Sequence, residues 1–141
     1  MENRVTEKHI KVNGREFILR KFTPFFGVYL ATQTFSNIVG SKNKLMALVQ
    51  SIMSKPKEEF IKLQQDVLSY CFEILPAGPT AVVDTNGNFA VMNIDGPLAL
   101  NLFTQTLLFS MMDFFTDEVM ESLTLGMENI LEEHLPSPQK I

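Results

Sequence analysis

The segment Ile10–Leu19 reads IKVNGREFIL, and it decides that the fold contains antiparallel β-structure. Two short runs rich in β-branched and aromatic residues flank Asn13-Gly14. This dipeptide suits a two-residue type I′ turn, because both central residues of such a turn take positive φ. The turn would place Ile10 opposite Phe17, with Leu19 on the same face of the hairpin as Phe17. The chain is therefore predicted to begin with a β-hairpin.

Three segments with helical spacing of apolar residues follow the hairpin. The first opens at Thr23-Pro24, where threonine can cap the helix and proline fits its first turn. The second and third repeat apolar residues at intervals of three and four, and the third includes Cys71. The sequence Pro-Ala-Gly-Pro at 76–79 is expected to end the third helix. The predicted helices cover 24–39, 45–53 and 58–74.

The second half of the chain repeats this order of hairpin and helix. Residues 81–92 flank Asn86-Gly87 and predict a second hairpin with the same turn logic. Asp95 and Pro97 open a long apolar helix that is expected to reach Phe115. A final amphipathic helix is predicted from apolar residues that share one helical face. They are Val119, Leu123, Met127, Ile130 and Leu131.

These elements predict an α+β fold, mostly α, with about five helices and two short β-hairpins. We find no linker long enough to separate two domains, so residues 1–134 are expected to form a single globular domain. Residues 135–141 contain two prolines and are expected to form a flexible C-terminal tail. Two hairpins are marginally stable alone, so helices must cover them.

The charge and the single cysteine exclude several classes of protein. A formal net charge of −4 argues against a nucleic-acid-binding protein, which carries a clustered basic surface. With Cys71 as the only cysteine, no intramolecular disulfide can form. Residues 1–8 are polar and precede no signal-peptide apolar run. The apolar stretch 98–115 contains six polar residues, which favours a buried helix over a membrane span. A cytoplasmic protein with no membrane partner is predicted.

The sequence offers no arrangement of residues that catalysis or metal binding requires. His9 and His134 stand near opposite ends of the chain, and Cys71 falls on an apolar helical stripe. One cysteine and two distant histidines give no zinc-ligand spacing, and the seven glycines are scattered singly rather than clustered in a phosphate loop. The chain is therefore predicted not to be an enzyme, with no cofactor, catalytic residue or metal site.

Pairs of large apolar residues supply the main physical indication of function. The chain has 12 Phe and 8 Met but no Trp, and it contains three such pairs in helical segments. Neighbours on a helix point about 100° apart, so one member of a pair can pack in the core while the other turns to the flank. Either these helices are buried on several sides, or a second surface meets a copy of the chain or another protein. The candidate protein-binding residues are Phe25, Phe26, Tyr29, Met111, Met112, Phe114 and Phe115.

Several short stretches, taken in order, point to a known family. They are FILRKF at 17–22, GVYLA at 27–31, LQQDVL at 63–68 followed by Cys71, LPAG at 75–78, NGNF at 86–89, LF at 108–109 and DFF at 113–115. In this order, over residues 10 to 115, the chain resembles the small tail assembly chaperones of tailed bacteriophages. The motifs are structural rather than catalytic, and their order carries the resemblance.

The resemblance implies a role in building the phage tail inside the host cytoplasm. Chaperones of this family bind the long, helical tape measure protein and keep it soluble until subunits of the tail tube protein polymerise around it. A chaperone that coats such a client could also form a homo-oligomer. The resemblance implies non-covalent binding without a nucleotide, and the family has no catalytic residues to carry over.

Two other functions remain open from the sequence. A structural phage protein, such as a tail terminator or connector subunit, would form a closed ring and stay in the virion. A small-molecule enzyme or ligand carrier would use a pocket lined by Phe side chains and would hold a stoichiometric ligand. Presence in purified virions separates the first of these from a chaperone.

Overall fold

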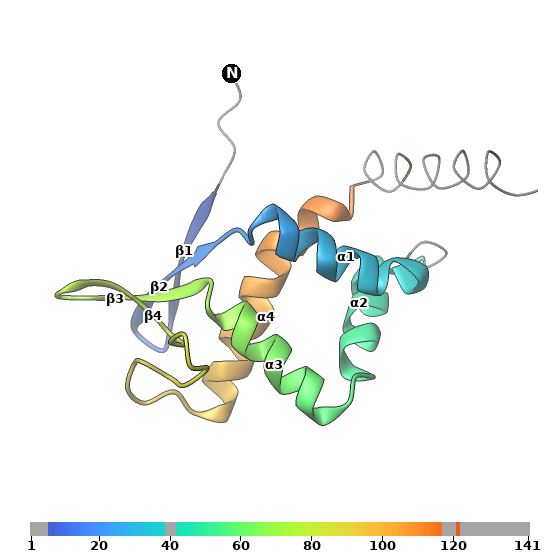
Figure 1. The fold of residues 1–141 in the computed structure, drawn as a ribbon. Helices are drawn as coiled ribbons and strands as arrows, with labels where there is room; N and C mark the ends of the chain where they lie inside the picture. Colours follow the sequence, from blue (N-terminus) through green and yellow to red (C-terminus); the bar gives the residue numbers. More distant parts are fainter. Residues whose placement is uncertain (1–5, 39–41, 117–120, 122–141) are drawn as a thin grey trace, which may run out of the picture.

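One antiparallel sheet and a group of helices make up the part of the chain that the structure describes. The structure is a computed structural model, and it describes residues 6–38, 42–116 and 121 (Figure 1). Its elements are β1 (Glu7–Val12), β2 (Arg15–Arg20), α1 (Pro24–Ile38), α2 (Lys44–Met53), α3 (Lys57–Leu68), β3 (Cys71–Leu75), β4 (Gly78–Ala81), α4 (Gly96–Met111) and the 3₁₀ turn η1 (Met112–Phe114). The strand order is β1-β2-β3-β4.

The first hairpin forms as the sequence predicts. Asn13 and Gly14 have φ of 52° and 78°, which are the positive values that a type I′ turn requires. Ile10 pairs with Phe17 across the two strands. Phe17 and Leu19 share one face of β2, and both are fully buried. The local turn chemistry is thus sufficient to fix the register of β1 and β2.

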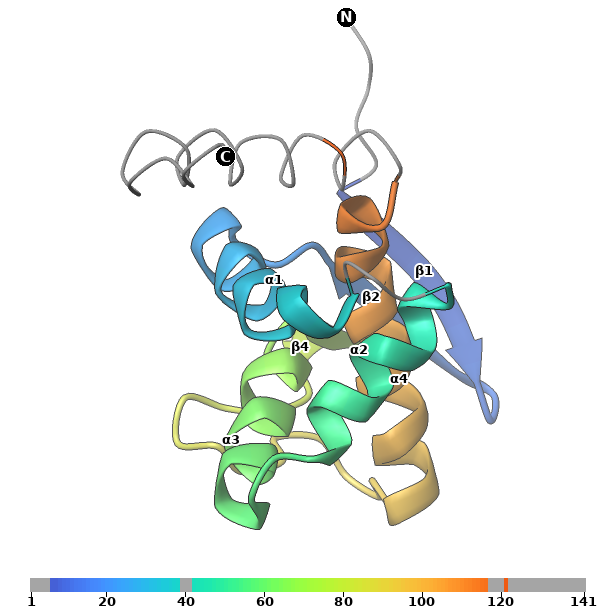
Figure 2. The same cartoon turned by 90° about the vertical axis from the view of Figure 1, so that its right-hand side faces the viewer.

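Helix α4 covers the sheet, and the other helices lie beyond it. Both views show the helices gathered on one side of the strands, with α4 nearest to them (Figures 1 and 2). Strand β2 pairs with β1 and β3 and contacts α4, while α3 and α1 also contact α4. The core between these layers is mostly apolar, and its fully buried members include Phe17, Leu19, Leu102 and Met111.

The prediction of a third helix as far as Ile74 is wrong, because the chain changes to a strand after Leu68. α3 ends at Leu68, and Cys71–Leu75 forms β3, which pairs with β2. Cys71 and Glu73 are buried while Phe72 and Ile74 are partly exposed, which is the alternation of a strand. Cys71 and Ile74 are also three residues apart, so they fitted the helical spacing equally well. Pairing with β2 decides between the two periods.

The Pro-Ala-Gly-Pro segment joins two strands instead of ending a helix. Leu75 pairs with Gly78, so Pro76 and Ala77 form the turn between β3 and β4. Proline fixes φ near −65°, which rules out the type I′ turn that the first hairpin uses. Gly78 takes φ of 121° and returns the chain to the sheet.

The second hairpin predicted at 81–92 is also wrong, since it shrinks to a loop with one bridge. Val83 and Phe89 form an isolated antiparallel bridge. Gly87 has φ of 82°, but Asn86 does not have positive φ, so the two do not form a type I′ turn. The carboxylate of Asp84 instead accepts hydrogen bonds from the backbone N–H groups of Asn86 (2.8 Å) and Asn88 (3.0 Å). This side-chain contact selects a longer loop.

The remaining helices begin where the sequence places them. Asn43 caps α2 by accepting from the N–H of Met46, and Asp95 caps α4 by accepting from the N–H of Leu98. α4 ends at Met111 rather than at Phe115, because the chain tightens into η1. Helix α4 is therefore about one turn shorter than predicted.

The predicted numbers of helices and hairpins therefore need correction. About five helices with two separate hairpins were expected, whereas the described residues form four α-helices and a single four-stranded antiparallel sheet. The class of the structure is α+β. The final helix predicted from Val119 to Leu131 and the tail at 135–141 lie outside the described residues, apart from the helical position 121.

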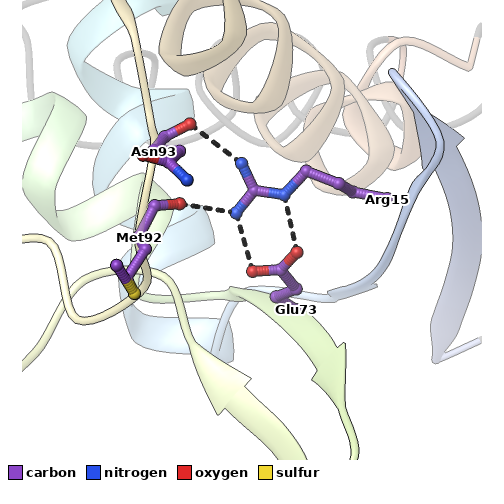
Figure 3. Close-up of polar contacts among 4 residues, drawn as sticks. All are labelled: Arg15, Glu73, Met92 and Asn93. Carbon is purple, nitrogen blue, oxygen red and sulfur yellow. Dashed lines mark hydrogen bonds and ion pairs between the residues drawn. The ribbon is translucent and has the colours of Figure 1, made fainter.

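A partly buried ion pair joins the sheet to the loop before α4 (Figure 3). Glu73 lies on the core face of β3 and is only 6% exposed. The guanidinium of Arg15 donates to both carboxylate oxygens of Glu73 at 2.7 and 2.8 Å, and to the backbone oxygens of Met92 (2.8 Å) and Asn93 (2.9 Å). A buried carboxylate is costly without such a partner. The four bonds therefore join β2, β3 and the 92–93 segment.

Removal of this guanidinium should destabilise the fold strongly. We expect Arg15→Gln to lower the free energy of unfolding in urea by about 3 to 5 kcal/mol, since it leaves the Glu73 carboxylate buried and unpaired. The matched control is Arg20→Gln at the other end of β2, where the pair with Glu7 spans 3.7 Å and both side chains are nearly half exposed. Arg20 also lies over the Phe72 ring, 4.2 Å from its centre, so this control should cost about 1 to 1.5 kcal/mol. Equal losses for the two variants would contradict the assignment.

Candidate protein-binding surface

Contacts with the end of α4 fix where α1 begins. The N–H of Phe22 donates to Ser110 Oγ at 2.9 Å. Lys21 Nζ donates to the backbone oxygen of Phe109, forms an ion pair with Asp113 at 3.1 Å and lies 4.0 Å from the centre of the Phe109 ring. Three kinds of interaction thus hold Lys21 and Phe22, two of the three residues between β2 and α1. These contacts fix the direction in which α1 leaves the end of α4.

The first aromatic pair divides between core and solvent. Phe26 packs beside Phe22 and stacks on Tyr70, with ring centres 4.9 and 5.7 Å away. Thr23 caps this turn, since its Oγ1 accepts from the N–H of Phe26 at 3.4 Å. Phe25 points the other way and is 90% exposed. The sequence left open whether both members of the pair are buried or one turns outward. The aromatic cluster with Tyr70 holds Phe26, and Phe25 is the exposed member.

An apolar patch lies on the solvent side of the first turns of α1. Phe25, Val28 and Tyr29 stand at positions i, i+3 and i+4, and they are 90%, 52% and 54% exposed. We call these three residues the α1 face. No residue of α1 is charged, whereas a surface helix normally carries charges on its outer side. The first turns of α1 therefore expose an uncharged apolar patch, followed by the exposed polar residues Thr32 and Gln33, and such a patch is typical of an interaction site.

A groove adjoins the α1 face, with α1 on one side and α3 on the other. Its volume is about 430 Å³. Phe26, Leu30 and Leu63 supply apolar surface, and Tyr29 belongs both to the groove and to the α1 face. The α3 side carries charges of both signs. The charged lining residues are Lys55, Glu58, Glu59, Lys62 and Asp66.

The second predicted region, Met111 to Phe115, is mostly internal. Met111 is fully buried, and Phe114 and Phe115 are partly buried against the core. Met112 is 51% exposed and lines a separate hollow with Lys21. The structure brings this region to α1 at one point: a Cβ placed on Gly27 would lie 3.4 Å from the Phe114 ring. Of the seven predicted residues, Phe25, Tyr29 and Met112 are therefore the accessible ones.

Two features of this surface were missed by the reasoning from sequence. Val28 completes the α1 face, and its position three residues after Phe25 would have identified it once Phe25 was known to face outward. The charged side of the groove comes from α3, which is far from α1 in sequence. Local spacing cannot show that α3 lies beside α1.

The sheet geometry separates the groups that a Cys/His site would need. His9 pairs with Ile18, which pairs with Phe72, so His9 lies on the same face as Phe72. Cys71 is the neighbour of Phe72 and therefore lies on the opposite, core face, where it is fully buried. Burial is the main cause that raises the pKa of the Cys71 thiol to about 12. At neutral pH this thiol is protonated and inaccessible, so it is no nucleophile.

The described residues contain neither a metal-binding cluster nor a helix that could cross a membrane. Within 6–38 and 42–116, no three His, Cys, Asp or Glu side chains gather as a metal site would require. Among the helices that the structure describes, none is both long and apolar enough to cross a membrane.

Comparisons with known proteins identify no family for this chain. No protein-family model, curated protein or solved structure matches this chain. The assignment of function therefore depends on the surface itself and on the resemblance described above.

The buried thiol should make stability depend on pH in alkaline solution. The unfolded thiol loses its proton above pH ~8.5, whereas the folded one keeps it to about pH 12, so the free energy of unfolding falls as pH rises through this window. Between pH 8 and 10 we expect this fall to be about 2 kcal/mol larger in the unaltered chain than in Cys71→Ala. Urea unfolding at both pH values measures it. An identical fall in both proteins would show that burial does not shift the thiol.

Proposed function

We propose that this protein is a non-enzymatic tail assembly chaperone of a tailed bacteriophage, which binds the tape measure protein in the host cytoplasm and keeps it soluble during tail tube assembly. The observation that supports the proposal best is the α1 face, where Phe25, Val28 and Tyr29 are exposed on a helix without charges. The sequence resemblance supplies the family, and the surface supplies a means of binding.

The chemistry of this surface suits an amphipathic helix. Such a helix presents apolar residues at intervals of three and four, which is the spacing of the α1 face. The adjacent groove offers apolar surface from Phe26, Leu30 and Leu63. Its α3 side carries both Lys and Glu, which can pair with charges that flank an apolar stripe and so select the register of the client.

Binding of this kind is reversible and needs no cofactor. Exposed aromatic and aliphatic side chains bind by burial of apolar surface, so any surface that covers the client's stripe more completely displaces the chaperone. Tail tube protein polymerising around the client is such a competitor. No covalent step is required of the chain.

Co-expression with the predicted client tests the function. The client is the large protein, rich in coiled-coil sequence, that is encoded just downstream in the same phage genome. We expect it to be soluble and to co-purify only when this chain is present. If the client stays insoluble and is not captured, the chaperone proposal fails. Finding this chain as a component of purified virions would instead support the structural tail protein.

Charge at the α1 face should abolish client capture without unfolding the chaperone. Phe25→Glu places a carboxylate in the apolar patch, and we expect client affinity to fall more than tenfold. Because Phe25 is 90% exposed, the free energy of unfolding should change by less than ~0.5 kcal/mol.

The matched control for this variant is Phe89→Glu. Phe89 is 49% exposed but belongs to the loop after β4, away from the α1 face. The control should capture the client as the unaltered chain does. Capture that survives Phe25→Glu, or that is lost equally in both variants, would exclude the α1 face as the binding surface.

A further inference from the structure

Strand β1 forms one edge of the sheet, and its outer side is open in the described part of the chain. β1 pairs with β2, and the strand order places no described strand beyond it. Figure 2 shows β1 at the margin of the sheet, with the helices on its other side. An open edge presents backbone N–H and C=O groups that can pair with another strand. This edge is therefore a candidate for pairing with a second chain.

The bonding pattern of the first hairpin identifies the backbone groups that lie on this edge. Val12 and Arg15 flank the two-residue turn, and such a flanking pair exchanges its backbone hydrogen bonds. The N–H of Lys21 also donates to the backbone oxygen of Thr6 at 3.2 Å. Even-numbered residues of β1 therefore bond to β2, and the backbone groups of the alternate residues point outward. The outward residues are Glu7, His9 and Lys11, whose side chains are exposed.

The two edges of the sheet differ in their protection against such pairing. β4, at the opposite edge, has four residues and includes Pro79, which has no N–H to donate. β1 has six residues, and its register with β2 runs without a bulge or a proline. Charged side chains are another device that keeps an edge strand apart, but on β1 they carry both signs. What they repel therefore depends on the register of the approaching strand.

One register of two β1 strands is complementary both in charge and in backbone bonding. Antiparallel pairing about a two-fold axis at His9 places Glu7 opposite Lys11 of the second copy, and Lys11 opposite Glu7 of the second copy. These residues belong to the outward set, so each pair can exchange two backbone hydrogen bonds. An axis at residue 7 or 11 instead sets two like charges face to face, which destabilises the pairing. An axis at residue 8 or 10 brings neither charge opposite the other.

We propose that this protein forms a two-fold symmetric dimer in which the β1 strands of two copies pair antiparallel about His9. The two four-stranded sheets then become one continuous sheet, and the opposite charges at both ends of the pairing select the register. A strand-to-strand contact is small for a protein interface, so the dimer exchanges with the monomer and its dissociation constant is measurable. The dimer depends neither on the tape measure protein nor on the α1 face.

Sedimentation equilibrium of the full-length chain, with variants that reverse the edge charges, tests this dimer. We expect the unaltered chain to show a monomer–dimer equilibrium. Glu7→Lys and Lys11→Glu each place like charges opposite one another at both ends of the pairing, so each should raise the dissociation constant about tenfold or more. An equal mixture of the two variants should form a mixed dimer as the unaltered chain does, because each Lys then faces a Glu. The double variant should recover for the same reason.

This recovery separates contacts between copies from contacts within the hairpin. Glu7 also pairs with Arg20 at 3.7 Å, and Lys11 lies opposite Glu16. Both contacts within the chain stay reversed in the double variant, so their effects add there rather than cancel. Glu16→Lys is the matched control, because it makes the same change of charge on an exposed residue of β2, away from the open edge. It should leave the dissociation constant within about twofold of the unaltered value.

The other outcomes overturn the proposal. A chain that stays monomeric up to about 1 mM forms no such dimer. A dimer that both single variants retain, or that neither the mixture nor the double variant restores, is held together elsewhere. An equal loss in Glu16→Lys would exclude the β1 edge as the specific contact. Failure of client capture leaves these measurements unchanged, so the dimer and the proposed function fail separately.

Discussion

The packing of β2 against α4 is the constraint on which the rest of the molecule depends. Phe17 and Leu19 of β2 are fully buried, and the same strand pairs with β1 on one side and β3 on the other. Only three residues separate β2 from α1, and two of them, Lys21 and Phe22, are bound to the end of α4. The position of α1 therefore follows from the contact between the sheet and α4.

This placement explains why an apolar helix remains partly in solvent. Gly27, Leu30 and Thr34 turn inward and are buried, which uses one side of α1. The opposite side has no counterpart in the described part of the chain, yet it carries Phe25 and Val28 instead of charges. Exposed apolar surface of this kind is a liability unless another helix covers it. A helix of the proposed client would meet this need.

The first hairpin was predictable because its information is local: Asn13-Gly14 sets both the turn and the register. Strand β3 was not predictable, because the spacing of Cys71 and Ile74 fits a helix as well as a strand. Only the pairing with β2 decides that this segment is a strand. The bond between Arg15 and Glu73 joins residues 58 positions apart, which no spacing rule can reveal. At the candidate site, the sequence left open whether each pair is buried on several sides or turns one member outward, and in the pair Phe25 and Phe26 one member is exposed. Contacts with Tyr70 decide that it is Phe25.

The central claim is that the α1 face is where another helix binds, and a photo-reactive phenylalanine analogue at position 25 tests it most directly. Co-expressed with the tape measure protein and irradiated, the chain should form a covalent adduct whose mapped sites fall at intervals of three and four along one stripe of the client. The same analogue at position 89 should give none. Adducts from position 89 but not from position 25, or none from either while the proteins still co-purify, would place binding elsewhere.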